Sequence, residues 1–234
     1  MKTTGIMGMV KLDLISIRGM FKQMLLLYGV CGLIVAVAMG DAVAIGPMLA
    51  VLAAMMLSFN LCAYDELNGW TRYRAALPLG RGDIVRGRYV SILILCLVAM
   101  VVGVIFAAVL QFALAAIPGG IGTHFAQGLP LAVLLAASAL GTCIVVLLEA
   151  FMLPFVFRYG FTKATRLVPV LVICTGMGLF ATLADKFDLA ALETSWIAVP
   201  SHAILVLVAV IVLVLLVYAA SSIVACRIYR DKEL

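Results

Sequence analysis

The chain has 234 residues, of which 66% are hydrophobic and 12% are charged, and its mean hydropathy is +1.27. Soluble domains carry about 25% charged residues, so this composition excludes a soluble globular domain and predicts an all-α membrane protein. The formal net charge of +5 does not indicate a nucleic-acid partner, because the placement of the basic residues decides their meaning. We treat residues 1–234 as a single transmembrane domain.

The first segment, residues 6–23, predicts an amphipathic helix that lies in the membrane interface. At about 100° per residue, Lys11, Arg18 and Lys22 fall within one narrow arc, where they can face anionic lipid headgroups. The apolar residues fall on the other side: Val10, Leu14, Ile17, Met20, Phe21 and Met24. Asp13 also lies on the apolar side and does not fit the pattern. The alternative is a plain cytoplasmic leader of the first span.

Six apolar runs follow, and we predict a transmembrane helix in each of them. Their ranges are 24–39, 42–64, 89–117, 129–157, 167–184 and 203–225. The first run ends in Ala36-Val37-Ala38, which also fits a signal-peptidase site, so a cleaved signal peptide is the alternative for that run. Residues 158–166 predict a short basic loop, and residues 185–202 predict an acidic loop on the outer side.

The basic residues orient these six spans. With the N-terminus in the cytoplasm, every Lys and Arg except Lys186 falls in a cytoplasmic segment. Such enrichment in short loops marks the cytoplasmic side of a membrane protein. We therefore predict a multi-pass protein of the cell membrane with six spans and both termini in the cytoplasm.

Sequence motifs for catalysis and for nucleotide binding are absent. The chain contains no G-x-x-x-x-G-K-[ST], no H-E-x-x-H and no G-x-S-x-G, so we expect it neither to bind ATP through a P-loop of its own nor to be an enzyme. Five of the six cysteines lie one to each of the first five spans, Cys226 directly follows the sixth, and there is no C-x-x-C pair, which favours packing residues over a metal site or a disulfide frame. We expect no catalytic, cofactor-binding or metal-binding residues.

Glu149 is the ionisable residue that lies inside an apolar run. A charge within a span is costly, so Glu149 is a candidate intramembrane polar site. The alternative is a carboxylate near the cytoplasmic end of its helix, paired with Arg158 or another base. If Glu149 carries protons instead, the protein is a secondary transporter driven by a proton gradient.

The longest polar interruption is the loop of residues 65–88, DELNGWTRYRAALPLGRGDIVRGR. Its first part, Glu66–Leu77, predicts a short helix that Pro78 ends, since proline cannot donate an amide hydrogen bond. Gly80 allows a sharp turn, and Asp83 is placed to cap a new helix that continues into the third span. By residue chemistry alone, an ordinary interfacial loop with a tryptophan anchor is an equal alternative.

The loop resembles the intracellular loop of ABC type-2 exporter permeases. In that family, an acidic, glycine-containing helix follows the second span, and a Leu-Pro-small-Arg turn leads to a helix that re-enters the membrane. The matching residues are Asp65-Glu66, Gly69, Trp70, Leu77-Pro78-Leu79-Gly80-Arg81, Asp83-Ile84-Val85 and Gly87-Arg88-Tyr89. Arg88 stands where the family often has lysine. A second match, residues 153–160 with Lys163-Ala164 and Arg166, resembles the small six-span branch that includes phenol-soluble modulin exporters.

The resemblance implies that this chain is the permease subunit of an ATP-driven exporter. Two permease subunits, identical or close paralogues, would form a pathway in the lipid bilayer, and two separate ATPase subunits would hold ATP and Mg. The implied coupling helix would contact the ATPase through Glu66, Asn68, Trp70, Arg72, Tyr73, Arg74 and Leu77. The turn after it would consist of Pro78, Gly80, Arg81 and Asp83. The resemblance also implies that the loop 185–202, with Trp196 and Pro200, gates exit on the outer side; the alternative is an ordinary outer loop.

Two other classes remain open from the sequence. One is the secondary transporter that uses Glu149, and the other is a non-transporting membrane partner subunit of a sensor or assembly complex. The nearly charge-free spans favour a hydrophobic or amphipathic substrate, and the resemblance adds peptides to that class. The sequence does not identify the substrate.

Overall fold

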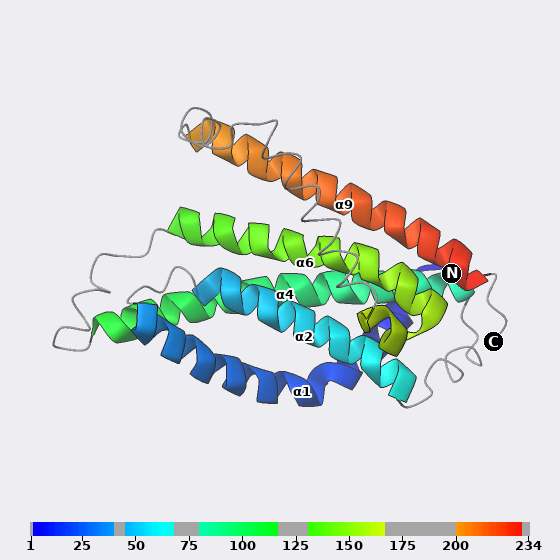
Figure 1. The fold of residues 1–234 in the computed structure, drawn as a ribbon, viewed down its shortest axis with the longest axis horizontal. Helices are drawn as coiled ribbons and strands as arrows, with labels where there is room; N and C mark the ends of the chain where they lie inside the picture. Colours follow the sequence, from blue (N-terminus) through cyan, green and yellow to red (C-terminus); the bar gives the residue numbers. More distant parts are fainter. Residues whose placement is uncertain (1, 40–44, 68–79, 117–130, 167–199, 231–234) are drawn as a thin grey trace. The chain divides into compact units, whose positions relative to one another are not determined.

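The computed structural model describes residues 2–39, 45–67, 80–116, 131–166 and 200–230. Its long helices are shown in Figure 1. They are α1 (Lys2–Met39), α2 (Ile45–Leu67), α4 (Arg81–Ala115), α6 (Leu131–Tyr159) and α9 (Pro200–Arg230). The described residues contain no strand, which confirms the all-α class for this part of the chain.

Four described helices are long and apolar enough to cross a membrane: α2, α4, α6 and the Ala203–Arg230 part of α9. They match the second, third, fourth and sixth predicted spans. The apolar part of α1, Leu26–Ala38, is shorter and lies within the first predicted span. The fifth predicted span and residues 185–199 of the outer loop lie outside the described residues, so the number of six spans stays a prediction. Residues 200–202, predicted as the end of the outer loop, are instead the first residues of α9.

The predicted loop over residues 158–166 is wrong. α6 continues to Tyr159, and residues 161–166 form a further short helix after Gly160. Gly160 has a φ of 89°, the left-handed conformation in which glycine ends many helices. Its amide donates to the Val156 carbonyl at 2.9 Å. The polar and basic residues of this segment indicated a loop, but lysine, arginine and alanine are also good helix formers.

The chain divides into two compact units, which we describe separately. Unit 1 contains Met1–Val146, and unit 2 contains Leu147–Lys232. Helix α6 contributes its first part to unit 1 and its second part to unit 2. Unit 1 therefore holds α1, α2, α4 and the beginning of α6, and unit 2 holds the end of α6 together with α9.

Glycines let the backbones of α2 and its neighbours approach closely in unit 1. A Cβ atom placed on Gly103 of α4 would lie 2.7 Å from the carbonyl oxygen of Gly46 and 3.1 Å from the amide nitrogen of Ala50. On the α6 side, a Cβ on Gly141 would lie 2.9 Å from a methyl carbon of Val51. Such close packing at small residues is typical of transmembrane helices.

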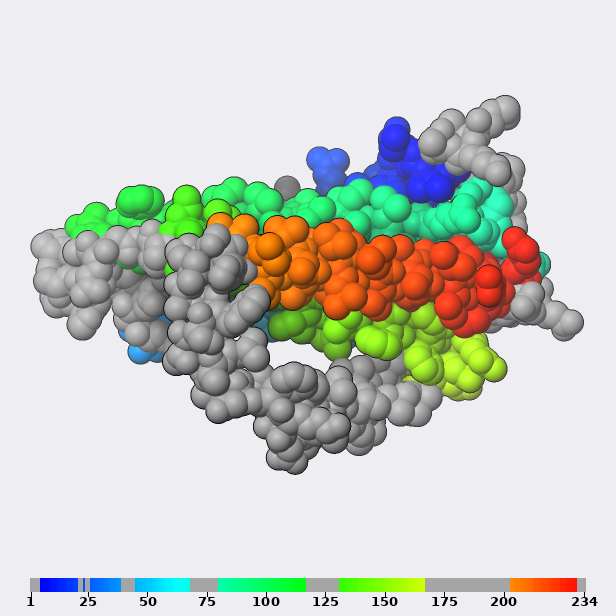
Figure 2. Space-filling model, turned by 90° about the horizontal axis from the view of Figure 1, so that it is seen from above, coloured from blue at the N-terminus to red at the C-terminus, as the bar shows by residue number. Residues whose placement is uncertain are grey.

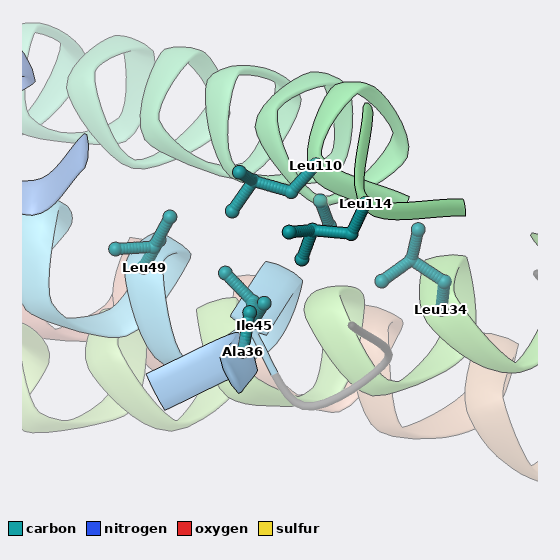
Figure 3. Close-up of a cluster of buried hydrophobic side chains, with 7 residues drawn as sticks. Ala36, Ile45, Leu49, Leu110, Leu114 and Leu134 are labelled. Carbon is teal, nitrogen blue, oxygen red and sulfur yellow. The ribbon is translucent and has the colours of Figure 1, made fainter. Parts of the chain in front are cut away.

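A buried apolar cluster joins four helix ends in unit 1, as Figure 3 shows. It consists of Ala36, Ile45, Leu49, Ala107, Leu110, Leu114 and Leu134. These residues come from the end of α1, the beginning of α2, the end of α4 and the beginning of α6. Successive helices of unit 1 therefore alternate in direction, as the predicted spans require.

Candidate functional site

The structure describes the two flanks of the predicted coupling loop. Of the predicted contact residues, Glu66 is described, and it lies exposed in the last turn of α2 beside Leu67, which is 82% exposed. The other contact residues, Asn68, Trp70, Arg72, Tyr73, Arg74 and Leu77, lie outside the described residues, as does Pro78. The predicted coupling helix therefore stays a prediction.

The loop ends where α4 begins, and the cap of this helix differs from the prediction. Gly80 occupies the N-cap position with an extended backbone (φ −64°, ψ 139°), no side chain caps the helix, and Arg81 is its first residue. The amides of Asp83 and Ile84 donate to the Gly80 carbonyl at 2.8 and 3.2 Å. Asp83 is therefore not the N-cap but the third helical residue, where its negative charge favours the helix N-terminus. Glycine is among the residues that N-cap positions accept.

Arg88 forms a buried ion triad with two aspartates from two other helices. Its Nη1 atom lies 3.2 Å from Oδ1 of Asp13 in α1, and its other terminal nitrogen pairs with Asp65 at the end of α2. The side chains of Asp13 and Arg88 are 0% and 3% exposed, and that of Asp65 is 21% exposed. We call these three residues the ion triad. It joins α1, α2 and α4 at one point.

The chemistry of arginine suits this position. A guanidinium presents several donors in a planar fork, so one side chain can hold two carboxylates at once. A buried charge must be paired, because an isolated one is strongly destabilising. Asp13 did not fit the amphipathic pattern of the N-terminal segment because its partner is supplied by another helix. The sequence signal was present, but sequence reasoning had no means to name Arg88 as that partner.

α1 also contacts α4 directly beside the ion triad. Met9 is fully buried, and a Cβ atom on Gly87 would lie only 2.7 Å from the Met9 Cβ. Met9 and Asp13 are one helical turn apart and therefore share a face of α1. They meet the successive residues Gly87 and Arg88 of α4. In Figure 2 the dark blue beginning of α1 lies against the turquoise beginning of α4.

The opposite face of this part of α1 is exposed. Lys11 and Arg18 are exposed, which agrees with the predicted basic arc, and Ile17 is buried as expected. Leu14, which was placed on the same apolar side as Ile17, is 38% exposed, and Ile15 is 70% exposed. The segment thus has one face against α4 and a second face that is both apolar and basic. Its position in the membrane interface stays a prediction.

In unit 2, a proline of α6 creates a polar contact with α9. Pro154 lies inside α6 and has no amide hydrogen, so the carbonyl of Ala150 loses the donor that an ordinary helix would supply. The hydroxyl of Ser221 in α9 donates to this Ala150 carbonyl. An unpaired backbone carbonyl is costly where no water is available, so Ser221 compensates for the proline.

We expect this compensation to show in a double-mutant cycle. Ser221→Ala should lower the free energy of unfolding by about 1 kcal/mol. In a Pro154→Ala background the same change should cost less, because the backbone at that position then supplies the missing amide hydrogen. Unfolding in mixed detergent micelles measures both values. Ser222→Ala is the control, since Ser222 donates within its own helix, to Ala219. Equal costs of Ser221→Ala in the two backgrounds would contradict this assignment.

The structure does not bring the two predicted intramembrane polar residues together. Glu149 is 2% exposed, whereas Arg158 is exposed and its guanidinium lies 5.2 Å from the ring centre of Tyr159. The two residues are nine positions apart on one continuous helix, which separates their backbones by about 13.5 Å. Glu149 is therefore a buried acid in a span, and its neighbour Ala150 accepts the Ser221 bond.

The cytoplasmic ends predicted for α6 and α9 lie together in unit 2. The rings of Phe157 and Tyr229 meet edge to face with centres 5.5 Å apart. Several basic residues belong to these helix ends and to the short helix that follows Gly160: Arg158, Lys163, Arg166, Arg227 and Arg230. The contact agrees with the placement of these basic segments on the same side of a membrane.

The chain matches a known protein family over most of its length. A family model described as "ABC-2 family transporter protein" matches residues 8–230, nearly the whole chain. No curated protein and no solved structure matches the chain. The family match, the apolar helices and the multi-pass architecture agree. The chain belongs to the ABC-2 transporter family and is the membrane permease of an ABC-type transporter, a subunit that works with a separate ABC ATPase.

Proposed function

We propose that this permease is an exporter subunit and that the loop between α2 and α4 is the segment on which the ATPase pushes when it changes conformation. We call this push the stroke of the ATPase. The observation that carries the proposal is the arrangement of the loop's two flanks. α2 ends at the exposed Leu67, α4 begins at Arg81, and the Asp65–Arg88 ion pair joins the two helices close to the loop. We therefore expect a force on residues 68–79 to act on α2 and α4 together, because the ion pair joins these two helices.

The proposed orientation places this loop and both termini in the cytoplasm, in a chain of six spans. The distribution of Lys and Arg supports it. The alternating helices of unit 1 support it too, because the beginning of α1, the end of α2 and the beginning of α4 meet at the ion triad, while the opposite ends meet in the apolar cluster.

The mechanism follows from how α2 and α4 are joined. The close approach of Gly46 and Gly103 holds the pair at one end, and the ion pair holds it at the other. Because both ends are held, we propose that the two helices move as one body when ATP closes the ATPase pair. With a second permease copy or a close paralogue, this motion would switch the pathway between two packings, with loop 185–202 as the outer gate.

The proposed substrate is hydrophobic or amphipathic, with peptides as the leading class. The described spans carry few charges, so they offer little to coordinate an ion or a sugar. Resemblance to exporters of amphipathic peptides supports the same class and the outward direction.

Reconstituted vesicles can test transport and its energy source. The permease is purified from native membranes with its ATPase and placed in vesicles, and uptake of a fluorescent amphipathic peptide is measured with ATP or with a proton gradient. Uptake into inside-out vesicles with ATP alone supports the exporter. Uptake that needs only the proton gradient would support the secondary transporter, and the absence of an ATPase from the purified complex would refute the proposal.

The coupling loop has a mutational test of its own. We expect Trp70→Ala and Glu66→Ala to leave the complex assembled but to lower peptide transport per ATP hydrolysed by about tenfold, since both remove contacts expected to carry the stroke. ATP hydrolysis and uptake are measured on the same vesicles. Arg86→Ala, an exposed change on α4, is the control. Unchanged coupling in both variants would argue against the coupling helix.

A further inference from the structure

The beginning of α1 is fastened to both helices that flank the coupling loop. We propose that residues 2–18 form a third transmission element, which moves with the loop and passes its motion to the first span, and that Asp13 is the positioning residue that holds it there. This inference rests on the proposed function, because it concerns how a motion that the ATPase supplies is transmitted through the permease.

The location of the ion triad supports this role. Asp65 lies two residues before the end of α2, and Arg88 lies seven residues after the start of α4. The guanidinium of Arg88 pairs with Asp65 and with Asp13 at the same time. A displacement of the loop that moves the ends of α2 and α4 therefore moves the carboxylate of Asp13 with them.

The contact also fixes α1 along its own axis. Met9 packs on Gly87 while Asp13 pairs with Arg88, and these contacts are one helical turn apart. If α1 slid by one turn, Asp13 would lose its cation while still buried, which is a costly state. Sideways and axial motion of α4 are thus both transmitted to α1.

The helix that receives this motion is continuous. α1 runs without interruption from Lys2 to Met39 and includes the apolar stretch Leu26–Ala38. Its outer face beside the ion triad carries the exposed Met7 and Ile15 together with Lys11 and Arg18, so no described helix covers this face. The beginning of α1 is therefore held on one face only. A displacement of the loop is transmitted along α1 to the first span.

Asp13→Asn tests the proposal sharply. The change keeps the size of the side chain and leaves Arg88 paired one to one with Asp65, so α2 and α4 stay joined. Nitroxide labels at Lys11→Cys and Arg86→Cys, in a chain whose native cysteines are replaced by alanine, report the distance between α1 and α4 by pulsed electron paramagnetic resonance. The measurement uses the permease alone and the full complex, with and without a non-hydrolysable ATP analogue.

We expect one narrow distance distribution in the parent chain, unchanged by nucleotide, because α1 and α4 move together. Asp13→Asn should broaden this distribution and lower transport per ATP by about tenfold, the effect of one lost charge-assisted hydrogen bond. Ser16→Ala, an exposed change one turn away whose hydroxyl bonds only within α1, should alter neither. A conservative Asp13→Glu should recover part of the coupling.

Three results would overturn the proposal: an unchanged distribution in Asp13→Asn, a distance that shifts with nucleotide in the parent chain, or full coupling despite a broadened distribution. Failure of the proposed function gives a different pattern. In that case parent vesicles show no ATP-driven uptake, which removes the transmission role as well. The distances in the permease alone still decide whether Asp13 fastens α1 to α4.

Discussion

Arg88→Ala should lower the free energy of unfolding by about 3–5 kcal/mol, because it removes the cation that pairs with the buried carboxylate of Asp13. Two acidic side chains pair with this arginine, and Asp13 is completely buried. Most of the variant should therefore fail to run as a single folded species in size-exclusion chromatography. Unfolding in mixed micelles gives the free energy wherever enough protein folds.

A matched control and a partial rescue make this expectation specific. Arg86→Ala removes an exposed arginine two positions away and should change stability by no more than about 0.5 kcal/mol. Adding Asp13→Asn to Arg88→Ala should recover part of the loss, since the buried carboxylate that has lost its Arg88 partner is then replaced by a neutral amide. Equal stability of Arg88→Ala and Arg86→Ala would show that the ion triad contributes nothing.

Gly103→Leu should lower the free energy of unfolding by about 3 kcal/mol, because it inserts a side chain where two backbones touch. The nearest atoms to the new Cβ would be the carbonyl oxygen of Gly46 and the amide nitrogen of Ala50. Backbone atoms cannot rotate away as a side chain can, so α2 and α4 would have to separate. Thermal unfolding in detergent, followed by size-exclusion chromatography, measures the effect.

Gly19→Leu is the control for this change. Gly19 lies in α1, and a Cβ there meets nothing within 4 Å, so the larger side chain should be tolerated. If Gly103→Leu unfolds at the same temperature as Gly19→Leu, the helices are not in the close contact described here. If both unfold early, the effect comes from leucine itself and not from packing.

Most of the helical architecture could be predicted because each span is a local signal. A run of apolar residues about 20 long indicates a bilayer-crossing helix by composition alone, and α2, α4, α6 and α9 follow such runs. Helix ends were predicted less well, because polar residues beside a span suit a loop and a helix equally. The basic segment around Gly160 was predicted as a loop for this reason, and it is helical.

The contacts of the candidate site could not be predicted, since they join residues far apart in the chain. Asp13 violated its own helical pattern, but nothing in its neighbourhood pointed to Arg88. The hydrogen bond from the Ser221 hydroxyl to the Ala150 carbonyl could not be predicted for the same reason. Pro154 predicts a carbonyl in need of a donor, while the identity of that donor depends on how α6 and α9 pack. The local sequence thus predicted that Asp13 and the Ala150 carbonyl each need a partner. Which residues serve as those partners follows from the packing of the helices.

The ion triad has a consequence for how the protein is made. A ribosome releases the chain from its N-terminus, so Asp13 and Asp65 reach the membrane before Arg88 has been synthesised. The glycine contact of α2 also awaits α4, because Gly103 lies in that later helix. The ion triad and the glycine contact therefore form only when the third helix is inserted, and biogenesis of this half of the permease should depend on that insertion.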